Sequence, residues 1–164
     1  MNFDTSTYER ITEDQFIRFI DTTPSSQTPT WALVAAVEEG GAGIEYNPNV
    51  DRVKFIVNKN ATTNHTSNDK QMGVDTYLAY KGDPCHTFAE AGRDKLNYKT
   101  RLLEVDLWNE TSGSYKAKMS NATLVVSSYH GDTIGFNVNA DGDPVEGTVT
   151  IANQVPTFTP SASL

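Results

Sequence analysis

From Trp31 onward, apolar residues of this chain alternate with other residues, and this two-residue period constrains the fold more than any other feature. Successive side chains of a β-strand point to opposite faces, so such alternation is typical of half-buried strands. The alternating positions are Trp31, Leu33 and Ala35; Val53, Phe55 and Val57; Val74, Thr76, Leu78 and Tyr80; Leu103, Val105 and Leu107; Leu124 and Val126; Ile134, Phe136 and Val138; and Val145, Val149 and Ile151. Turn-forming residues at 39–41, 112–114, 130–132 and 141–144 separate several runs. The pattern predicts a mainly β fold of two packed antiparallel sheets, as a sandwich or a partly open barrel.

One flanking α-helix is expected within this β-rich sequence. Asp83 is a favourable N-cap residue, and Pro84 suits the first helical position. An apolar stripe at helical spacing follows, made of Cys85, Phe88, Ala89, Gly92 and Leu96. We therefore predict a helix that begins at Pro84 and packs on the strands.

The first 30 residues differ in character from the rest of the chain. Thr12 and Gln15 have capping-box spacing, and Phe16, Phe19 and Ile20 continue an apolar helical face, which predicts a short helix over about 13–21. The polar, proline-marked segment 22–30 then reads as a linker. These signals predict an N-terminal arm at 1–27, a β-sandwich domain at 28–152 and a short C-terminal tail at 153–164.

A long polar segment lies between Asn58 and Lys70, with the sequence NKNATTNHTSNDK and no periodicity. Loops of this length are unusual in a compact domain, and most of them are either functional or disordered. We expect an extended loop in this region.

Charge limits the classes of partner. The 164-residue chain carries a net charge of −8, which disfavours tight binding to phosphates, because that needs clustered Lys and Arg. The chain has no run of about 18 apolar residues, so no membrane-spanning helix is predicted. The polar, acidic N-terminus lacks the features of a signal peptide, and Cys85 is the one cysteine, so synthesis in a cytoplasm is expected.

The search for catalytic, metal-binding or cofactor-binding residues gives no candidate. His65, His86 and His130 are far apart in sequence, and Cys85 lies on the apolar helical stripe, where an inert buried thiol is the favoured interpretation. Glu104 and Asp106 share one strand face and suggest a carboxylate pair for glycoside hydrolysis, although a solvated acidic face is commoner. We expect no enzyme activity and no cofactor.

Several motifs occur in a fixed order along the chain. In the second half they are Val105-Asp106-Leu107-Trp108-Asn109, Ser114-Tyr115-Lys116-Ala117-Lys118, Thr123-Leu124-Val125-Val126 and Gly142-Asp143-Pro144-Val145-Glu146-Gly147-Thr148. Upstream of them lie Thr28-Pro29-Thr30-Trp31-Ala32-Leu33, Tyr46-Asn47-Pro48, Asn60-Ala61-Thr62 and Lys81-Gly82-Asp83-Pro84. With these motifs, residues 28–150 resemble the major tail tube proteins of siphophages, the bacteriophages with long non-contractile tails. Lys116 stands where that family often has proline.

The resemblance implies a structural virion protein made in the host cytoplasm. Such subunits form hexameric rings whose inner sheets join into one β-barrel, and the rings stack into a hollow tube that conducts phage DNA during ejection. The implied partners are further copies of the chain and the tip or distal tail, terminator and tape-measure proteins. DNA would pass through the lumen without specific binding, and an acidic wall suits that passage because it repels phosphate.

The resemblance also suggests roles for particular residues. The lumen candidates are Glu104 and Asp106, which share one strand face, with Asp75 as a weaker candidate; an outer or inter-subunit face is the alternative placement. Both terminal arms and the segment at 58–70 would reach neighbouring rings. The residues assigned to this inter-ring loop are Asn58, Asn60, Thr62, Asn64, His65, Asn68 and Lys70.

A β-sandwich carbohydrate-binding or adhesion module is the alternative from another class. It requires several exposed aromatic side chains on one sheet face, with Trp108 as one candidate. The aromatic residues are scattered over the predicted elements, which favours the tail tube.

Overall fold

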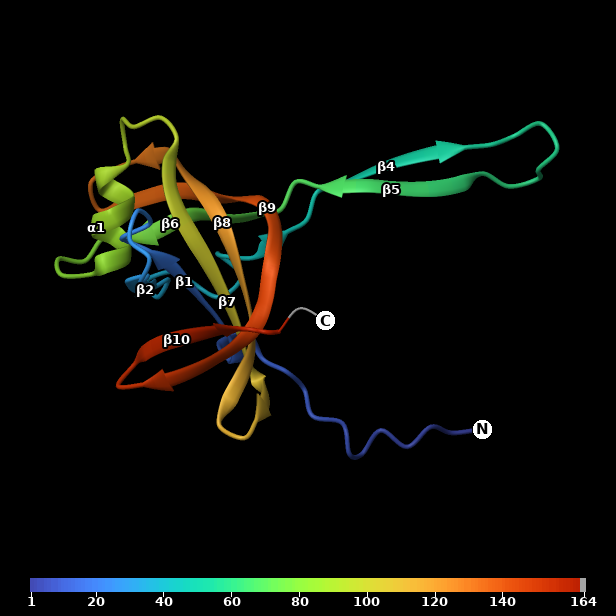
Figure 1. Cartoon of the computed structure of the whole chain (residues 1–164), viewed down its shortest axis with the longest axis horizontal. Coiled ribbons are helices and arrows are strands. Elements are labelled where there is room, and N and C mark those ends of the chain that lie inside the picture. The colour runs from blue at the N-terminus through green and yellow to red at the C-terminus, as the bar shows by residue number, and fades with distance from the viewer. Residues whose placement is uncertain (163–164) are drawn as a thin grey trace.

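The computed structural model describes residues 1–162, and these form two antiparallel sheets and one α-helix, with no closed barrel. The predicted mainly β fold class with one flanking helix is confirmed. In chain order the elements are the 3₁₀ turn η1 (Glu13–Gln15), β1 (Phe16–Asp21), β2 (Trp31–Leu33), β3 (Ile44–Glu45), β4 (Pro48–Val53), β5 (Thr62–Asn68), β6 (Gln71–Leu78), α1 (Pro84–Ala91), β7 (Tyr98–Thr111), β8 (Ser114–Tyr129), β9 (Thr133–Ala152) and β10 (Val155–Pro160). Figure 1 shows their arrangement.

The larger sheet has eight strands in the order β2-β1-β7-β8-β9-β6-β3, and β10 pairs with the second half of β9. The sheet curls until its two ends approach each other. Phe16 of β1, Ile44 of β3 and Glu104 of β7 line one small cavity of about 170 Å³. The segment after β2 bridges the ends, because the amide of Leu78 on β6 donates to the carbonyl of Ala36 at 2.8 Å. Within the described chain the result is a partly open barrel.

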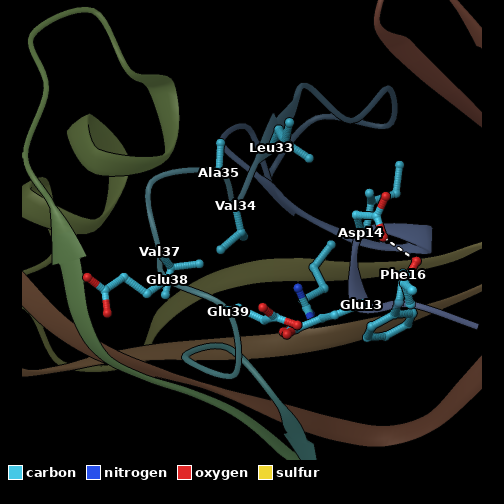
Figure 2. A pocket seen from close by; sticks show the side chains of 12 residues that line it. Glu13, Asp14, Phe16, Leu33, Val34, Ala35, Val37, Glu38 and Glu39 are labelled. Atoms are coloured by element: carbon cyan, nitrogen blue, oxygen red, sulfur yellow. Dashed lines mark hydrogen bonds and ion pairs between the residues drawn. The ribbon is translucent and has the colours of Figure 1, made fainter.

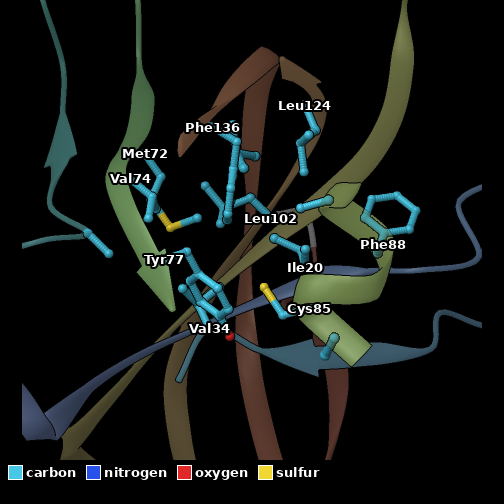
Figure 3. Close-up of a cluster of buried hydrophobic side chains, with 14 of the residues drawn as sticks. Ile20, Val34, Met72, Val74, Tyr77, Cys85, Phe88, Leu102, Leu124 and Phe136 are labelled. Carbon is cyan, nitrogen blue, oxygen red and sulfur yellow. The ribbon is translucent and has the colours of Figure 1, made fainter. Parts of the chain in front are cut away.

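Two hydrophobic cores lie on opposite faces of this sheet. Neighbouring residues of β7 divide between them, because Leu102 packs in the larger core and Leu103 in the smaller one. The larger core, shown in Figure 3, joins Met72, Tyr77, Phe136 and helix α1. The smaller core lies where β7, β8 and β9 meet β1 and β10, and its fully buried members include Val105 and Val149.

Helix α1 begins as predicted and ends sooner than its apolar stripe suggests. The carboxylate of Asp83 accepts a hydrogen bond from the amide of Cys85 at 3.0 Å, and Pro84 occupies the first turn. Cys85, Phe88 and Ala89 face the core. The helix stops at Ala91, and Leu96 is 92% exposed, so that stripe position is not part of the buried face.

The predicted helix at 13–21 is wrong. Residues 13–15 form the single turn η1, with the amide of Thr12 bonded to the side chain of Gln15, and residues 16–21 form β1. β1 pairs with β7 on one side and β2 on the other, and its last four residues are buried. A strand buried on both faces shows no alternation, so its apolar residues matched a helical face by chance. The N-terminal arm therefore ends near residue 12, and not at residue 27.

The expected loop at 58–70 is also corrected. Residues 62–68 form β5, which pairs with β4, and together they make a hairpin that runs out from the curled sheet in Figure 1. β4 ends at Val53, so the predicted strand over 53–57 instead forms part of the hairpin turn. A polar segment adopts this structure because backbone hydrogen bonds between strands do not depend on side-chain polarity.

The C-terminal segment is part of the sheet for most of its length. β10 pairs with β9 over six residues, from Val155 to Pro160, so the domain continues beyond the expected boundary at 152. The last two residues of the predicted tail, 163–164, lie outside the described residues. Among residues 1–162, no helix has the length and apolar character needed to span a membrane.

Candidate functional site

The β4–β5 hairpin is the most exposed regular structure in the molecule. All residues of β4 and of β5 are exposed, so neither face of this hairpin packs on a core. The most apolar part of the hairpin is its turn, where Phe55, Ile56 and Val57 are 61%, 101% and 85% exposed. Exposed apolar side chains grouped in this way mark surfaces that bind a partner.

The base of the hairpin is held by a buried ion pair. Lys70, just after β5, places its Nζ 2.5 Å from Oε2 of Glu104 on β7, and both side chains are at most 9% exposed. The same Nζ lies 5.4 Å from the ring centroid of Tyr46, which precedes β4. Both strands of the hairpin are thus tied to the curled sheet at one point.

The seven residues assigned to an inter-ring loop lie in three settings. Asn58 and Asn60 are in the hairpin turn, and Lys70 is in the buried ion pair at the base. The remaining residues, Thr62, Asn64, His65 and Asn68, lie on β5 and are exposed. His65 Nε2 is 2.6 Å from the side-chain oxygen of Asn68, which stabilises the strand locally. The hairpin therefore keeps six of the seven residues on an accessible surface.

The three lumen candidates differ in their exposure. Glu104 is 7% exposed and paired with Lys70, and the expectation that it presents a free charge to a lumen does not fit this burial. Asp106 is half-buried beside Lys118 in the small cavity at the curled end of the sheet. Asp75 is exposed on β6. Asp75 and Asp106 remain the predicted lumen residues.

Sequence reasoning missed a groove between β1, β2 and the segment that follows β2, which we call the β1–β2 groove. It has a volume of about 590 Å³, and Figure 2 shows its lining. Its walls include the apolar side chains of Phe16, Ile17, Leu33, Val34, Ala35 and Val37, and its acidic residues are Glu13, Asp14, Glu38 and Glu39. The only signal in the sequence was Glu38-Glu39 before two glycines, which indicated a turn.

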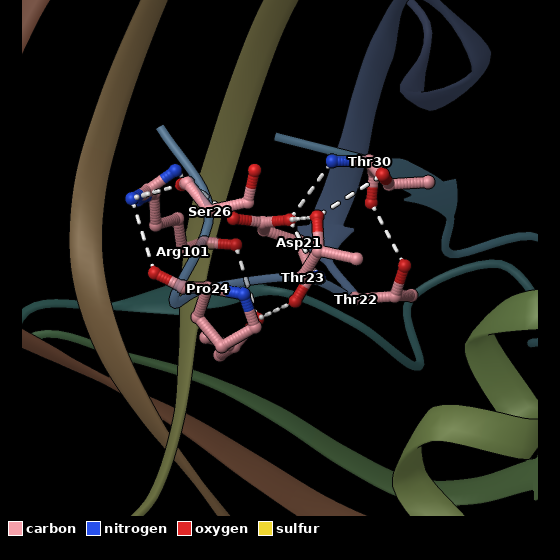
Figure 4. Close-up of polar contacts among 8 residues, drawn as sticks. Asp21, Thr22, Thr23, Pro24, Ser26, Thr30 and Arg101 are labelled. Atoms are coloured by element: carbon pink, nitrogen blue, oxygen red, sulfur yellow. Dashed lines mark hydrogen bonds and ion pairs between the residues drawn. The ribbon is translucent and has the colours of Figure 1, made fainter. Parts of the chain in front are cut away.

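A network of polar contacts centred on buried Asp21 holds the segment at 22–30, as Figure 4 shows. Asp21 is fully buried, and its Oδ1 accepts hydrogen bonds from the amides of Thr23 and Thr30 at 2.9 and 3.0 Å. Its Oδ2 accepts one from Arg101 at 3.1 Å. Arg101 also donates to the carbonyls of Pro24 and Ser26. The segment is a fixed loop of the domain, and the interpretation as a linker is wrong.

The one cysteine of the chain lies in the larger core, as expected of an inert thiol. Burial raises the pKa of Cys85 from its ordinary 9.0 to about 12, and the nearby charge of Asp83 also raises it. Burial likewise raises the pKa of Tyr77, whose hydroxyl donates to Asp83 at 2.7 Å. No group of three His, Cys, Asp or Glu side chains within residues 1–162 is arranged to hold a metal ion.

The raised pKa of Cys85 predicts a loss of stability in alkali. Below pH about 9 the thiol is protonated in both states; between pH about 9 and about 12 it ionises only in the unfolded state. Over that window ionisation of Cys85 alone should lower the free energy of unfolding by about 1.4 kcal/mol per pH unit, and the raised pKa of Tyr77 should steepen the fall above pH about 10. Urea denaturation at a series of pH values measures this slope. Cys85→Ala should remove the contribution of the thiol to this slope and leave the contribution of Tyr77. If the slope in the variant equals that of the native chain, Cys85 is not the group responsible.

The chain was compared with models of known protein families and with curated protein sequences, and neither comparison finds a match. The features of the described residues that bear on function are a curled open sheet, an exposed hairpin held by a buried ion pair, and an acidic groove.

Proposed function

We propose that this chain is the major tail tube subunit of a bacteriophage with a long non-contractile tail. Copies of it would form hexameric rings, and the rings would stack into a hollow tube that conducts DNA. The order of the motifs between residues 28 and 150 supports the family, and the shape of the subunit supports assembly. The β4–β5 hairpin is the observation that carries the proposal.

A hairpin with both faces in solvent gains little from burial. An isolated two-stranded hairpin is at best marginally stable in water, because it has no hydrophobic face to cover. Here all residues of both strands are exposed, and the apolar turn is exposed most. Contact with a neighbouring ring would cover these residues and stabilise the hairpin. In a monomeric domain they would stay exposed.

The ends of the curled sheet also favour assembly. β2 and β3 stand at the two ends of the strand order and contain three and two residues. Unpaired strand edges invite pairing with another chain, and ring formation satisfies them in a controlled way. Neighbouring subunits in a ring would extend the sheet at these ends.

The overall charge agrees with a conduit for DNA. A net charge of −8 on each subunit, repeated around a tube, creates a negative field that repels phosphate. Exposed Asp75 and half-buried Asp106 are the acids we assign to the wall. DNA would then move past without adhering to the protein.

The carbohydrate-binding alternative finds no aromatic platform in the described residues. The two aromatic ring pairs among the described residues, Tyr77 with Phe136 and Phe88 with Tyr98, contain none of the exposed aromatic side chains, which are Phe3, Tyr8, Tyr46, Phe55, Tyr80, Trp108 and Tyr129. Sugar platforms need such rings side by side on one face, so we favour the assembly function.

Electron microscopy of the purified, concentrated protein tests the proposal. We expect rings or hollow tubes for the native chain. In a matched variant, residues 50–66 are replaced by Asn-Gly, a two-residue turn that suits a hairpin. This variant should keep its melting temperature, because the removed residues pack on no core, and it should not form tubes.

One outcome would contradict the proposal, and another would contradict only the role given to the hairpin. One is a native protein that stays monomeric at high concentration, also after addition of purified tail-tip complexes, and binds glycans on an array. The other is a hairpin-deleted variant that forms tubes as readily as the native chain, since the hairpin would then have no part in assembly.

A further inference from the structure

We propose that the turn of the β4–β5 hairpin docks into the β1–β2 groove of a second copy of this chain. We call residues 52–59 the hairpin tip. This inference rests on the proposed assembly, and it names the two surfaces that meet within it. Their chemistry is complementary in both charge and polarity.

The hairpin tip is basic and apolar. Its sequence, RVKFIVNK, has Arg52, Lys54 and Lys59 and no acidic residue, in a chain whose net charge is −8. Between these cations stand Phe55, Ile56 and Val57, all more than half exposed. A tip of this composition would bury its apolar side chains most favourably in an apolar cavity with an acidic rim.

The β1–β2 groove has that composition. Four carboxylates line it against one guanidinium, that of Arg18. Arg18 is already paired with Glu13 at 3.2 Å. The other carboxylate oxygen of Glu13 accepts a hydrogen bond from the amide of Gly40 at 2.8 Å. Glu38 and Glu39 are exposed, and no ion pair within the described residues engages them. They are free to meet an incoming cation.

The floor of the groove suits the apolar part of the tip. Leu33 of the outermost strand β2 is 43% exposed beside buried Val34, and a volume of about 590 Å³ lies within the roughly 300–1,000 Å³ of typical ligand sites. Arg18 is 8% exposed, and its Nε has no hydrogen-bond partner in the part of the chain that the structure describes. A carbonyl oxygen of an incoming backbone would satisfy that donor after a small shift of the side chain.

The tip does not reach the groove of its own chain. Figure 1 shows the hairpin running away from the sheet that contains β1 and β2, and the ion pair of Lys70 with Glu104 fixes its base. Each β-strand residue adds about 3.3 Å, so the six residues of β4 carry the tip roughly 20 Å outward. The occupant is therefore the tip of another copy.

A binding measurement tests the docking without requiring tubes. A fluorescently labelled peptide of residues 50–61 is titrated with the full chain, at concentrations where the chain is monomeric, and anisotropy is recorded. We expect saturable binding that weakens as salt is added, because the contacts are partly ionic. Glu38→Lys with Glu39→Lys in the protein should weaken binding at least about tenfold.

Charge reversal on both sides gives the sharper test. A peptide carrying Arg52→Glu, Lys54→Glu and Lys59→Glu should not bind the native chain but should bind the chain with Glu38→Lys and Glu39→Lys. The control chain carries Asp94→Lys and Glu110→Lys, which change the net charge equally and lie outside the groove. It should bind the native peptide nearly as well as the unaltered chain does.

The docking is overturned if no saturable binding is found, or if the groove substitutions leave the binding unchanged. Displacement of the tip peptide by a peptide of residues 1–12 would overturn it as well, because it would identify the N-terminal arm as the occupant. Binding of the tip peptide to anionic lipid vesicles and not to the protein would also overturn it.

If tubes form with the groove substitutions as readily as without them, the docking fails while the tail tube proposal stands. If the peptide docks as expected and no tubes form, the docking stands and the tube proposal fails.

Discussion

Replacing Lys70 with methionine is expected to lower the free energy of unfolding by about 3–5 kcal/mol, because the change leaves a buried carboxylate without its counter-charge. The ion pair of Lys70 and Glu104 has a separation of 2.5 Å, and both side chains are at most 9% exposed. Urea denaturation followed by tryptophan fluorescence measures the loss. The same variant should also loosen the hairpin, since Lys70 lies at its base.

Two further variants show whether burial causes the effect. Lys99→Met removes an exposed ion pair to Asp141, with side chains 59% and 47% exposed, and should cost no more than about 1 kcal/mol. Lys70→Met combined with Glu104→Met replaces both charges with apolar groups and should recover most of the lost stability. If Lys70→Met and Lys99→Met lower the free energy of unfolding equally, burial of the pair of Lys70 and Glu104 does not cause the effect.

Asp21→Ala is expected to lower the free energy of unfolding by a similar amount, about 3–5 kcal/mol. Asp21 is fully buried and accepts hydrogen bonds from two backbone amides and from Arg101. Its removal leaves these donors without an acceptor. Hydrogen exchange should then show fast exchange of the Thr23 and Thr30 amides, in addition to the lower stability in urea.

The matched control for this prediction is Asp141→Ala. The side chain of Asp141 is 47% exposed, accepts a hydrogen bond from Thr123 and is paired with Lys99 at 3.5 Å, so its loss should cost about 1 kcal/mol or less. A loss below about 1 kcal/mol for Asp21→Ala, with the Thr23 and Thr30 amides still protected, would mean that other contacts hold the loop.

Local patterns predicted helix α1 and the long strands well. The cap at Asp83 and the proline after it act within one helical turn, so the start of the helix is visible in the sequence. The alternation of apolar residues in β7, and in β9 around Phe136, arises because successive side chains of a strand point to opposite faces. This geometry depends only on neighbouring residues, so the sequence shows it.

The two-residue pattern is absent from β1 and from β5, for opposite reasons. β1 is buried on both faces, so its apolar residues do not alternate and the sequence predicts a helix there. β5 is exposed on both faces, so its polar residues do not alternate either and the sequence predicts a loop. Apolar and polar residues alternate along a strand only where one face is buried and the other is exposed. Neither β1 nor β5 has two such different faces.

The candidate site was only partly visible for a related reason. Glu104 and Asp106 share a strand face, as expected, but burial of Glu104 depends on Lys70, which lies 34 positions away. The groove depends on Glu13 and Glu38 coming together from separate segments.

The sequence by itself determined the β-rich class, the position of the helix and the acidic character of the chain, because these follow from residues that are close together or from composition. The tertiary structure decided which charges are buried, that the segment at 22–30 is fixed by Arg101, and that the polar segment before Lys70 projects as a hairpin. Contacts between residues far apart in the chain set these features, and no local preference of the backbone encodes them.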